Sequence, residues 1–293
     1  MIVSLTLIAI SLIALVVRGL NFGIDFTGGY VVEAGFEQAA ELDDLRKHFA
    51  SSNLGEAIVQ NFGTSTEVLV RLAPQEELTG AAVNTEVKRL LDSAGQGAID
   101  LRRVEFVGPQ VGEELREQGG LAVLIALGFI VVYIWLRFEK KFSVGAVAAL
   151  VHDVVITLGV FALTQIEFDL SVLAAILAVI GYSLNDTIVV FDRIRENFRS
   201  VRKATPENIM NISINQTLSR TIITSLTTLL VLLALFILGG ETINSFSMAL
   251  IIGVVVGTYS SIYVASSSVL ALGITREDMM PVVKEGGELD HIP

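Results

Sequence analysis

The segment Leu170–Phe191 reads LSVLAAILAVIGYSLNDTIVVF and decides the fold class. A helix of this length can cross the hydrocarbon core of a membrane, because it rises about 1.5 Å per residue and the core is about 30 Å thick. The segment also contains Asn185 and Asp186, and polar side chains are costly to place in lipid. The segment is therefore predicted to be a transmembrane helix whose polar pair faces other helices rather than lipid, and the pair is a candidate functional site.

Five other apolar runs accompany this segment. Hydrophobic residues make up 52% of the chain and its mean hydropathy is +0.66, which is typical of membrane proteins. The first run is short for a span, but it lacks the basic start and the small-residue cleavage site of a signal peptide. We therefore expect six transmembrane helices. The five other runs are Ile2–Val17, Gly119–Leu136, Phe142–Thr164, Ile222–Leu238 and Ser245–Leu272.

Basic residues gather in two of the expected loops and predict the orientation of the chain. By the positive-inside rule these loops are cytoplasmic, so the segment 18–118 lies outside and both termini lie inside. We expect the basic residues to fix the orientation rather than to bind a specific lipid or nucleic acid. They are Arg137, Lys140 and Lys141 in the first loop, and Arg193, Arg195, Arg199, Arg202, Lys203 and Arg220 around the second.

The outer segment 18–118 has the periodicity of a mixed α+β domain. It holds 9 Lys and Arg and 17 Asp and Glu, so it carries most of the chain's net charge of -11. Its predicted order is βαββαβ, the split order of ferredoxin-like domains, and about 100 residues suffice for a small core. The expected elements are Tyr30–Phe36, Glu41–Ala50, Ala57–Phe62, Glu67–Leu72, Thr79–Ala94 and Ile99–Val107.

Two glycine-rich stretches are predicted to be the turns that join this domain to the membrane. Gly23–Gly29 (GIDFTGG) lacks the Lys of a phosphate-binding loop and precedes a strand, so a tight turn is expected there. Val107–Gly112 (VGPQVG) is expected to be the turn into the second span. The expected fold is membrane α-helical with one periplasmic α+β domain. Its parts are 1–18 (transmembrane helix 1), 19–118 (the domain), 119–273 (helices 2–6) and 274–293 (a cytoplasmic tail).

Charged side chains inside two of the spans are the candidate functional residues. His152 and Asp153 lie near the middle of the third span, and Asn185 and Asp186 lie in the fourth. Arg220 is the matching cation, at the start of a polar stripe before the fifth span. We expect Asp186 and Arg220 to approach within ion-pair range and to form a pair that breaks with protonation. A static ion pair is the alternative for these two residues.

Two further alternatives concern single residues. Arg220 could extend to the cytoplasmic interface instead of pairing, because long basic side chains reach water from a buried backbone. His152 and Asp153 form either a satisfied hydrogen-bonded pair or part of a proton relay. Gly253 and Gly257 have the spacing of a helix-packing motif, and Gly239-Gly240 is expected to be a turn.

Enzymatic chemistry has little support in the sequence. The chain has no cysteine and only three scattered histidines, so thiol catalysis is excluded, no metal site is expected, and neither is a cofactor. No catalytic triad or nucleotide-binding motif is present. An intramembrane aspartyl protease would need Asp153 and Asp186 to share a proton, and their different depths disfavour it. We therefore expect a protein that is not an enzyme.

Several motifs together resemble the SecF family of protein-export subunits, within the wider SecD/SecF family and the RND superfamily. The run Val179–Asn197, VIGYSLNDTIVVFDRIREN, is similar to the family's fourth-span signature. Further matches in order are Gly23–Gly29, Val107–Gly112, His152–Val154, Thr217–Thr221 and Gly257–Ala265. The resemblance covers nearly the whole chain. The chain departs from the family at its start, where members often carry a basic stretch before the first span.

The resemblance implies a function and a set of partners. It implies a subunit of the bacterial inner membrane that pairs with SecD and associates with the SecYEG channel and YajC. With SecD it would use the proton-motive force to help preproteins leave the membrane after ATP-driven insertion by SecA. In the family, an Asp at position 186 and an Arg at position 220 are tied to proton movement.

A transporter is the remaining alternative. Half of an RND-type exporter of small molecules or lipids would also combine spans with an outer domain. That reading predicts a larger outer domain than the segment 18–118 provides.

Overall fold

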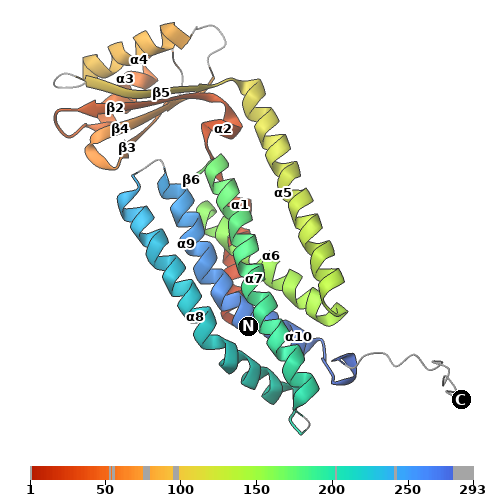
Figure 1. The fold of residues 1–293 in the computed structure, drawn as a ribbon. Coiled ribbons are helices and arrows are strands. Elements are labelled where there is room, and N and C mark those ends of the chain that lie inside the picture. Colours follow the sequence, from red (N-terminus) through yellow and green to blue (C-terminus); the bar gives the residue numbers. More distant parts are fainter. Residues whose placement is uncertain are drawn as a thin grey trace, which may run out of the picture.

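The computed structural model describes residues 2–52, 54, 57–74, 80–94, 99–201, 203–240 and 243–279. Long helices form a bundle, and an α+β domain lies at one end of it (Figure 1). The expected tail 274–293 lies outside the described residues from residue 280 onward. The candidate functional residues are in the bundle.

Among the described residues, five helices are long and apolar enough to cross a membrane. The helix α1 (Ile2–Val17) is also apolar, but with 16 residues it is short for a span. It packs along α6, where Ser11 lies against Gly159. The five longer helices are α5 (Pro109–Arg137), α6 (Lys140–Thr164), α7 (Leu170–Ser200), α8 (Pro206–Leu238) and the run Asn244–Ala271, which comprises α9 (Asn244–Tyr259), a π-helical turn (Ser260–Ala265) and α10 (Ser266–Ala271).

The helices extend beyond the apolar runs that predicted them. The helix α5 begins at Pro109 rather than Gly119, and α8 begins at Pro206 rather than Ile222. Both starts place proline in the first helical turn, where its missing N–H costs nothing. The helix α7 continues past the apolar run to Ser200. Hydropathy detects only the part of a helix that lies in lipid, which is why the polar ends were missed.

The α+β domain has the element order expected from its sequence. Its sheet has the strand order β3-β4-β2-β5, and every neighbouring pair is antiparallel. The prediction for Thr79 lies outside the described residues. The elements are β2 (Gly29–Phe36), α3 (Leu42–Ala50), β3 (Ala57–Phe62), β4 (Thr64–Leu72), α4 (Gly80–Ala94) and β5 (Ile99–Val107).

The two faces of this sheet have different neighbours. Helices α3 and α4 cover the face that points away from the bundle, and their apolar side chains form the domain core with Val32 and Val70 (Figure 1). Alternate residues of a strand point to opposite faces, so Val31 and Leu69 face the other way. They form a small separate cluster with Ile24, which belongs to the segment leading from the membrane.

The expected turn at Gly23–Gly29 contains a short helix, α2 (Ile24–Thr27). It follows β1 (Asn21–Phe22), which pairs in parallel with β6 (Glu167–Phe168) in the loop before α7. Gly28 and Gly29 have positive φ values of 69° and 123°, which glycine adopts without strain. A Cβ on Gly112 would lie 2.8 Å from the backbone nitrogen of Gly28, so the start of α5 packs directly on this segment.

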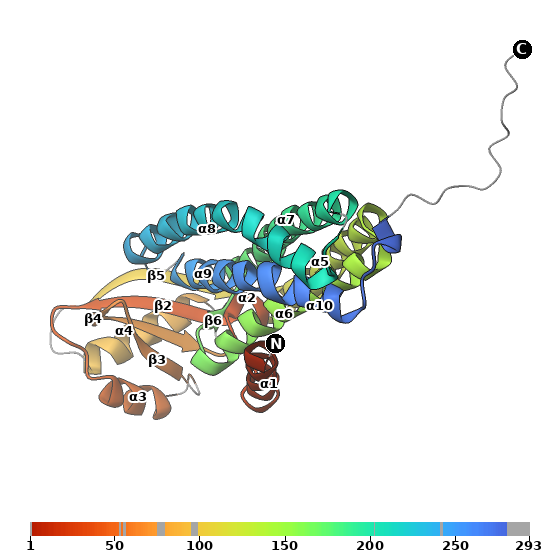
Figure 2. The ribbon, with the colours of Figure 1, turned by 90° about the horizontal axis from the view of Figure 1, so that it is seen from below.

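The expected turn at Val107–Gly112 is shorter than predicted. Only Gly108 separates β5 from α5, because α5 already begins at Pro109 with Gly108 as its N-cap. In Figure 1, α5 runs along the outside of the bundle, and Figure 2 gives the view from below. Of its residues only Gly112 and Ile134 are buried, while Leu127 and Ile130 are partly buried and pack against the core of the bundle.

Candidate functional site

Asp153 lies at the centre of α6 and is almost completely buried. Its side chain is 1% exposed and accepts hydrogen bonds from three groups. With its proton on Nδ1, His152 donates to Oδ1 over 2.9 Å, while the hydroxyls of Ser183 and Ser260 both donate to Oδ2. The Ser260 contact is 2.7 Å long. This arrangement suits a carboxylate, whose oxygens accept and never donate.

Asp186 lies on α7, one turn after Ser183, and is only partly buried. Thr221 of α8 donates to its Oδ1 over 2.7 Å, and Ser261 of the π-helical turn donates to its Oδ2. The carboxylate therefore joins three helical segments. Asp186 keeps some exposure, whereas Asp153 is almost completely buried.

Only one of the two ring nitrogens of His152 makes a hydrogen bond among the described residues. Its Nδ1 bonds to Asp153, while Nε2 is buried and has no hydrogen-bond partner among the described residues. The imidazole ring lies 6.2 Å from the ring of Tyr259, whose hydroxyl bonds to Ser4 of α1. With the proton on Nδ1, Nε2 keeps a lone pair that can accept a hydrogen bond.

The expected ion pair between Asp186 and Arg220 is not formed in this structure. No ion pair among the described residues joins them, and the Arg220 side chain is exposed. Its neighbour Thr221 makes the contact instead. Successive residues on an α-helix point about 100° apart, so when Thr221 faces Asp186, Arg220 points to the outside of the bundle. The sequence placed the two charges on the correct helices but could not fix the rotation of α8.

Asn185 is exposed on α7 and takes no part in this cluster of hydrogen bonds. The polar contacts of the site come instead from small hydroxyl residues. Ser183, Thr221, Ser260 and Ser261 lie within the motifs Val179–Asn197, Thr217–Thr221 and Gly257–Ala265, but the sequence alone gives none of them a role. The sequence pattern that marks these residues is a hydroxyl side chain at helical spacing within an apolar span. This pattern is too common to identify a site.

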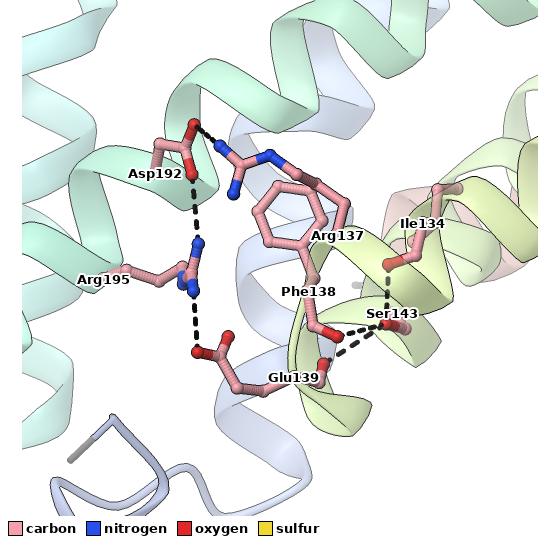
Figure 3. Close-up of polar contacts among 7 residues, drawn as sticks. All are labelled: Ile134, Arg137, Phe138, Glu139, Ser143, Asp192 and Arg195. Atoms are coloured by element: carbon pink, nitrogen blue, oxygen red, sulfur yellow. Dashed lines mark hydrogen bonds and ion pairs between the residues drawn. The ribbon is translucent and has the colours of Figure 1, made fainter. Parts of the chain in front are cut away.

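A second polar cluster lies at the end of the bundle opposite the α+β domain, where α5, α6 and α7 meet (Figure 3). Arg195 bridges Glu139 at 2.8 Å and Asp192 at 3.4 Å, and Asp192 also pairs with Arg137 at 2.8 Å. The guanidinium groups of Arg137 and Arg195 lie 5.1 and 5.5 Å from the ring centre of Phe138. The basic residues of these loops therefore also hold three helices together.

The domain meets the bundle through a buried ion pair. Arg71 of β4 pairs with Glu167 of β6, and their side chains are 8% and 27% exposed. Burial raises the pKa of the Glu167 carboxyl, while the charge of Arg71 acts in the opposite direction and Asp169 and Asp25 add to the rise. Asp25 also accepts a hydrogen bond from the backbone N–H of Leu170. Polar contacts thus fix the underside of the sheet to the rim of the bundle.

The described residues hold no group of three or more histidine and acidic side chains suited to a metal ion. Asp153 and Asp186 are also not hydrogen-bonded to each other, since each accepts from its own set of donors. The arrangement is that of two separately held carboxylates in a helical bundle. Such carboxylates can take up and release protons.

Comparison with protein families gives two matches. The family described as "Protein export membrane protein SecD/SecF, C-terminal" matches residues 86–275, and the "SecD/SecF GG Motif" matches residues 13–40. The second match contains Gly28 and Gly29, which both have positive φ, and α5 packs against Gly28.

Curated relatives are similar over nearly their full length. The chain is 52% identical to the protein translocase subunit SecF of Vibrio alginolyticus, covering 99% of this chain and 93% of that protein. It is 50% identical to the SecF of Pseudomonas aeruginosa, with 95% and 90% covered. With the SecF of Escherichia coli O157:H7 it shares 46% identity, with 99% and 91% covered.

Two solved structures of SecDF are also similar. The crystal structure of SecDF from Thermus thermophilus, described as a translocon-associated membrane protein, matches with a TM-score of 0.83 and 41% identity. A SecDF structure in a super-membrane-facing form matches with a TM-score of 0.67 and the same identity. In both cases the match covers 92% of this chain and 37% of the SecDF chain.

Proposed function

The chain belongs to the SecD/SecF family of protein export membrane proteins, and we propose that this subunit of Sec protein export draws on the proton-motive force. The observation that carries the proposal is Asp186, a carboxylate inside a transmembrane helix that joins α7, α8 and the π-helical turn. An ionisable side chain at this depth is costly, and a functional role is its usual explanation. His152, Asp153, Asn185 and Arg220 complete the proposed proton-coupling set.

The proposed membrane topology has six spans, with both termini on the cytoplasmic side. Helix α1 is the first of six spans of RND type, both termini lie in the cytoplasm of a bacterial cell, and the spans lie in the inner membrane. Residues 19–118 form a periplasmic ferredoxin-like domain between span one (1–18) and the remaining spans (119–273), and 274–293 form a cytoplasmic tail. The cluster of Arg137, Arg195 and their acidic partners supports this orientation, because basic residues favour the cytoplasmic side.

The proposed partners are those of the export machinery. SecD is the first, because the similar SecDF structures contain more than twice the length of this chain, which covers 37% of them. The SecYEG channel, SecA-driven preproteins and YajC are the further partners, with the lipid bilayer as solvent and no nucleic acid involved. The role is that of a transport component and not of an enzyme.

Proton uptake by Asp186 is the proposed switching step. A protonated carboxyl no longer accepts two hydroxyl hydrogen bonds as a carboxylate does, so its contacts with Thr221 and Ser261 weaken. Helix α8 can then rotate. A rotation by about 100° would bring Arg220 to Asp186 in place of Thr221. After the proton has left, the Asp186 carboxylate could form the ion pair expected from the sequence, and the next protonation would break it.

The energy available is sufficient for such a switch. One charge that crosses a membrane potential of 100 mV releases about 2.3 kcal/mol. That free energy biases a two-state equilibrium by more than tenfold, since about 1.4 kcal/mol corresponds to a factor of ten. Movement of the helices would reach the domain through α5 and through the contact of Arg71 with Glu167.

The test is Asp186→Asn in membrane vesicles that carry the whole export machinery. We expect ATP-driven insertion of a preprotein to continue and the stimulation by the proton-motive force to be lost, while co-purification with SecD is unchanged. Glu196→Gln is the matched control, because Glu196 lies on the same helix and makes only a surface ion pair with Arg193. Normal stimulation in the Asp186→Asn vesicles would rule out Asp186 as the coupling residue.

A further inference from the structure

The last transmembrane run is interrupted by a π-helical turn, Ser260–Ala265. Such turns are rare, and many occur at functional sites. This one begins with two consecutive serines, both buried in the structure. Their hydroxyls contact two different carboxylates: Ser260 donates to Asp153 on α6, and Ser261 donates to Asp186 on α7. One short segment therefore contacts both candidate acids, Asp153 and Asp186.

Each of these serines has a second acceptor within reach. The hydroxyl of Ser260 lies 3.1 Å from the carbonyl oxygen of Gly257, and that of Ser261 lies 3.0 Å from the carbonyl oxygen of Thr258. A hydroxyl has a single hydrogen, so it favours either the carboxylate or the carbonyl. The charged carboxylate is the stronger acceptor. When it takes up a proton, the carboxyl itself becomes a donor and the serine hydrogen turns to the backbone carbonyl.

Helix α7 connects the same two acids a second time. Ser183 donates to Asp153, and Asp186 follows one turn later on the same helix. The other titratable side chains around the cluster are His152 on α6, Tyr182 on α7, Tyr259 on α9 and Tyr263 in the π-helical turn, and Arg220 lies exposed on α8. None of these groups hydrogen-bonds to both acids among the described residues.

We propose that Ser260 and Ser261 are positioning residues that couple the titration of Asp153 to that of Asp186. When one acid is protonated, its serine turns to the backbone carbonyl and the hydrogen bonding of the π-helical turn changes. The adjacent serine then shifts relative to the other acid. The use of this coupling in export rests on the proposed function. The coupling between the two acids does not, because it follows from the contacts within the bundle.

Infrared difference spectroscopy tests the coupling directly. The chain in complex with SecD is reconstituted in liposomes, and the carboxyl bands that disappear in Asp153→Asn and in Asp186→Asn are followed against pH. Removing a hydroxyl that donates to a carboxylate favours the protonated form. We expect Ser261→Ala to move the midpoint of the Asp186 band to higher pH. Ser260→Ala removes a hydroxyl that contacts Asp153 and not Asp186, yet it should move the midpoints of both bands, by about threefold or more in proton concentration.

Ser266→Ala is the matched control. Ser266 is a buried serine in the same run, and its hydroxyl has no hydrogen-bond partner among the described residues, so both midpoints should stay unchanged. If Ser260→Ala moves the Asp153 band alone, the coupling is refuted. Should the alanine variant fail to insert, Ser260→Cys keeps the volume, donates only weakly and must give the same double shift. If Asp186→Asn supports normal export while Ser260→Ala still shifts both midpoints, the proposed function is refuted and the coupling between the two acids still holds.

Discussion

Two carboxylates on neighbouring helices differ in how they are held. Asp153 is buried and accepts from His152, Ser183 and Ser260, whereas Asp186 is partly exposed and accepts from two hydroxyls. A buried group with a full set of donors resists change, because each donor left without an acceptor costs free energy. The contacts of Asp153 are therefore expected to be harder to change than those of Asp186, which is the proposed site of proton exchange.

Asp153→Asn is expected to destabilise the protein more than Asp186→Asn. The amide would place an NH2 group against hydroxyls that now donate, and each unsatisfied buried donor costs about 1–3 kcal/mol. The measurement is the free energy of unfolding of the purified protein in mixed micelles with increasing denaturing detergent. Equal losses for the two variants would show that burial does not separate their roles.

At the scale of helices, small residues set how closely the bundle packs. A Cβ on Gly253 of α9 would overlap the side chain of Val179 on α7, and one on Gly257 would lie 3.0 Å from the Cβ of Ser183. The glycine pair expected to pack helices does so, and it packs them at the site. This close approach brings the π-helical turn within hydrogen-bonding distance of Asp153 and Asp186.

Gly253→Ala is expected to lower the free energy of unfolding by about 1–3 kcal/mol, because the added methyl overpacks the contact between α7 and α9. Gly128→Ala is the matched control, since a Cβ at Gly128 on α5 meets nothing within 4 Å. Alanine is the better helix former by about 1 kcal/mol, so the control should be neutral or more stable. Detergent unfolding of both variants measures the difference, and a stabilised Gly253→Ala would contradict the packing.

The cluster at the ends of α5, α6 and α7 makes a second prediction for these elements. Arg195 joins Glu139 and Asp192, and its side chain is only 18% exposed (Figure 3). Arg195→Ala should lower the free energy of unfolding by about 1–2 kcal/mol through lost ion pairs and the lost contact with Phe138. Arg195→Lys should not restore it, because an ammonium group cannot bridge two acids as a planar guanidinium does.

Arg193 is the control for this cluster. It lies two residues away on α7, is 40% exposed, and pairs only with Glu196 in the helix surface. Pairs of this kind contribute little, so Arg193→Ala should leave the unfolding curve nearly unchanged. Equal effects of the two arginine variants would mean that the cluster is a surface feature without a packing role.

At the scale of the whole molecule, the α+β domain and the bundle are joined at few places. They are linked covalently through α2 and α5, and by polar contacts between β4 and the loop that contains β6 (Figure 1). The two similar SecDF structures give TM-scores of 0.83 and 0.67 at equal identity and coverage, so the structure of this chain is more similar to the first than to the super-membrane-facing form. The pair Arg71–Glu167 is the contact that a change of arrangement in this chain would have to break.

The docking of the domain on the bundle is expected to depend on pH through Glu167. Burial raises the pKa of its carboxyl above the ordinary value of 4.5, despite the opposing charge of Arg71. A carboxyl whose pKa is raised by docking stabilises the docked state fully at pH below 4.5, and this contribution is lost as the pH rises through the raised pKa. Lower pH should therefore favour the docked arrangement.

Spin-label distances can follow this docking. The chain contains no cysteine, so labels can be placed at two introduced cysteines, Ser65→Cys on the domain and Thr164→Cys at the end of α6. The docked distance should gain population as the pH falls toward 4.5. Glu167→Gln is neutral at every pH and should abolish the dependence, and a dependence that survives this change would assign the effect to another group.

The sequence by itself determined the membrane class, the position of the apolar helices, the strand and helix order of the outer domain and the candidate acids Asp153 and Asp186. These features follow from local hydropathy, from residue periodicity and from the cost of charge in lipid, all of which are written along the chain. Only the tertiary structure decided that Thr221 rather than Arg220 contacts Asp186, and that Ser260 and Ser261 hold two acids at once. Those contacts depend on the rotation of each helix about its axis, which is set by packing between segments far apart in the sequence, such as Gly253 against Val179.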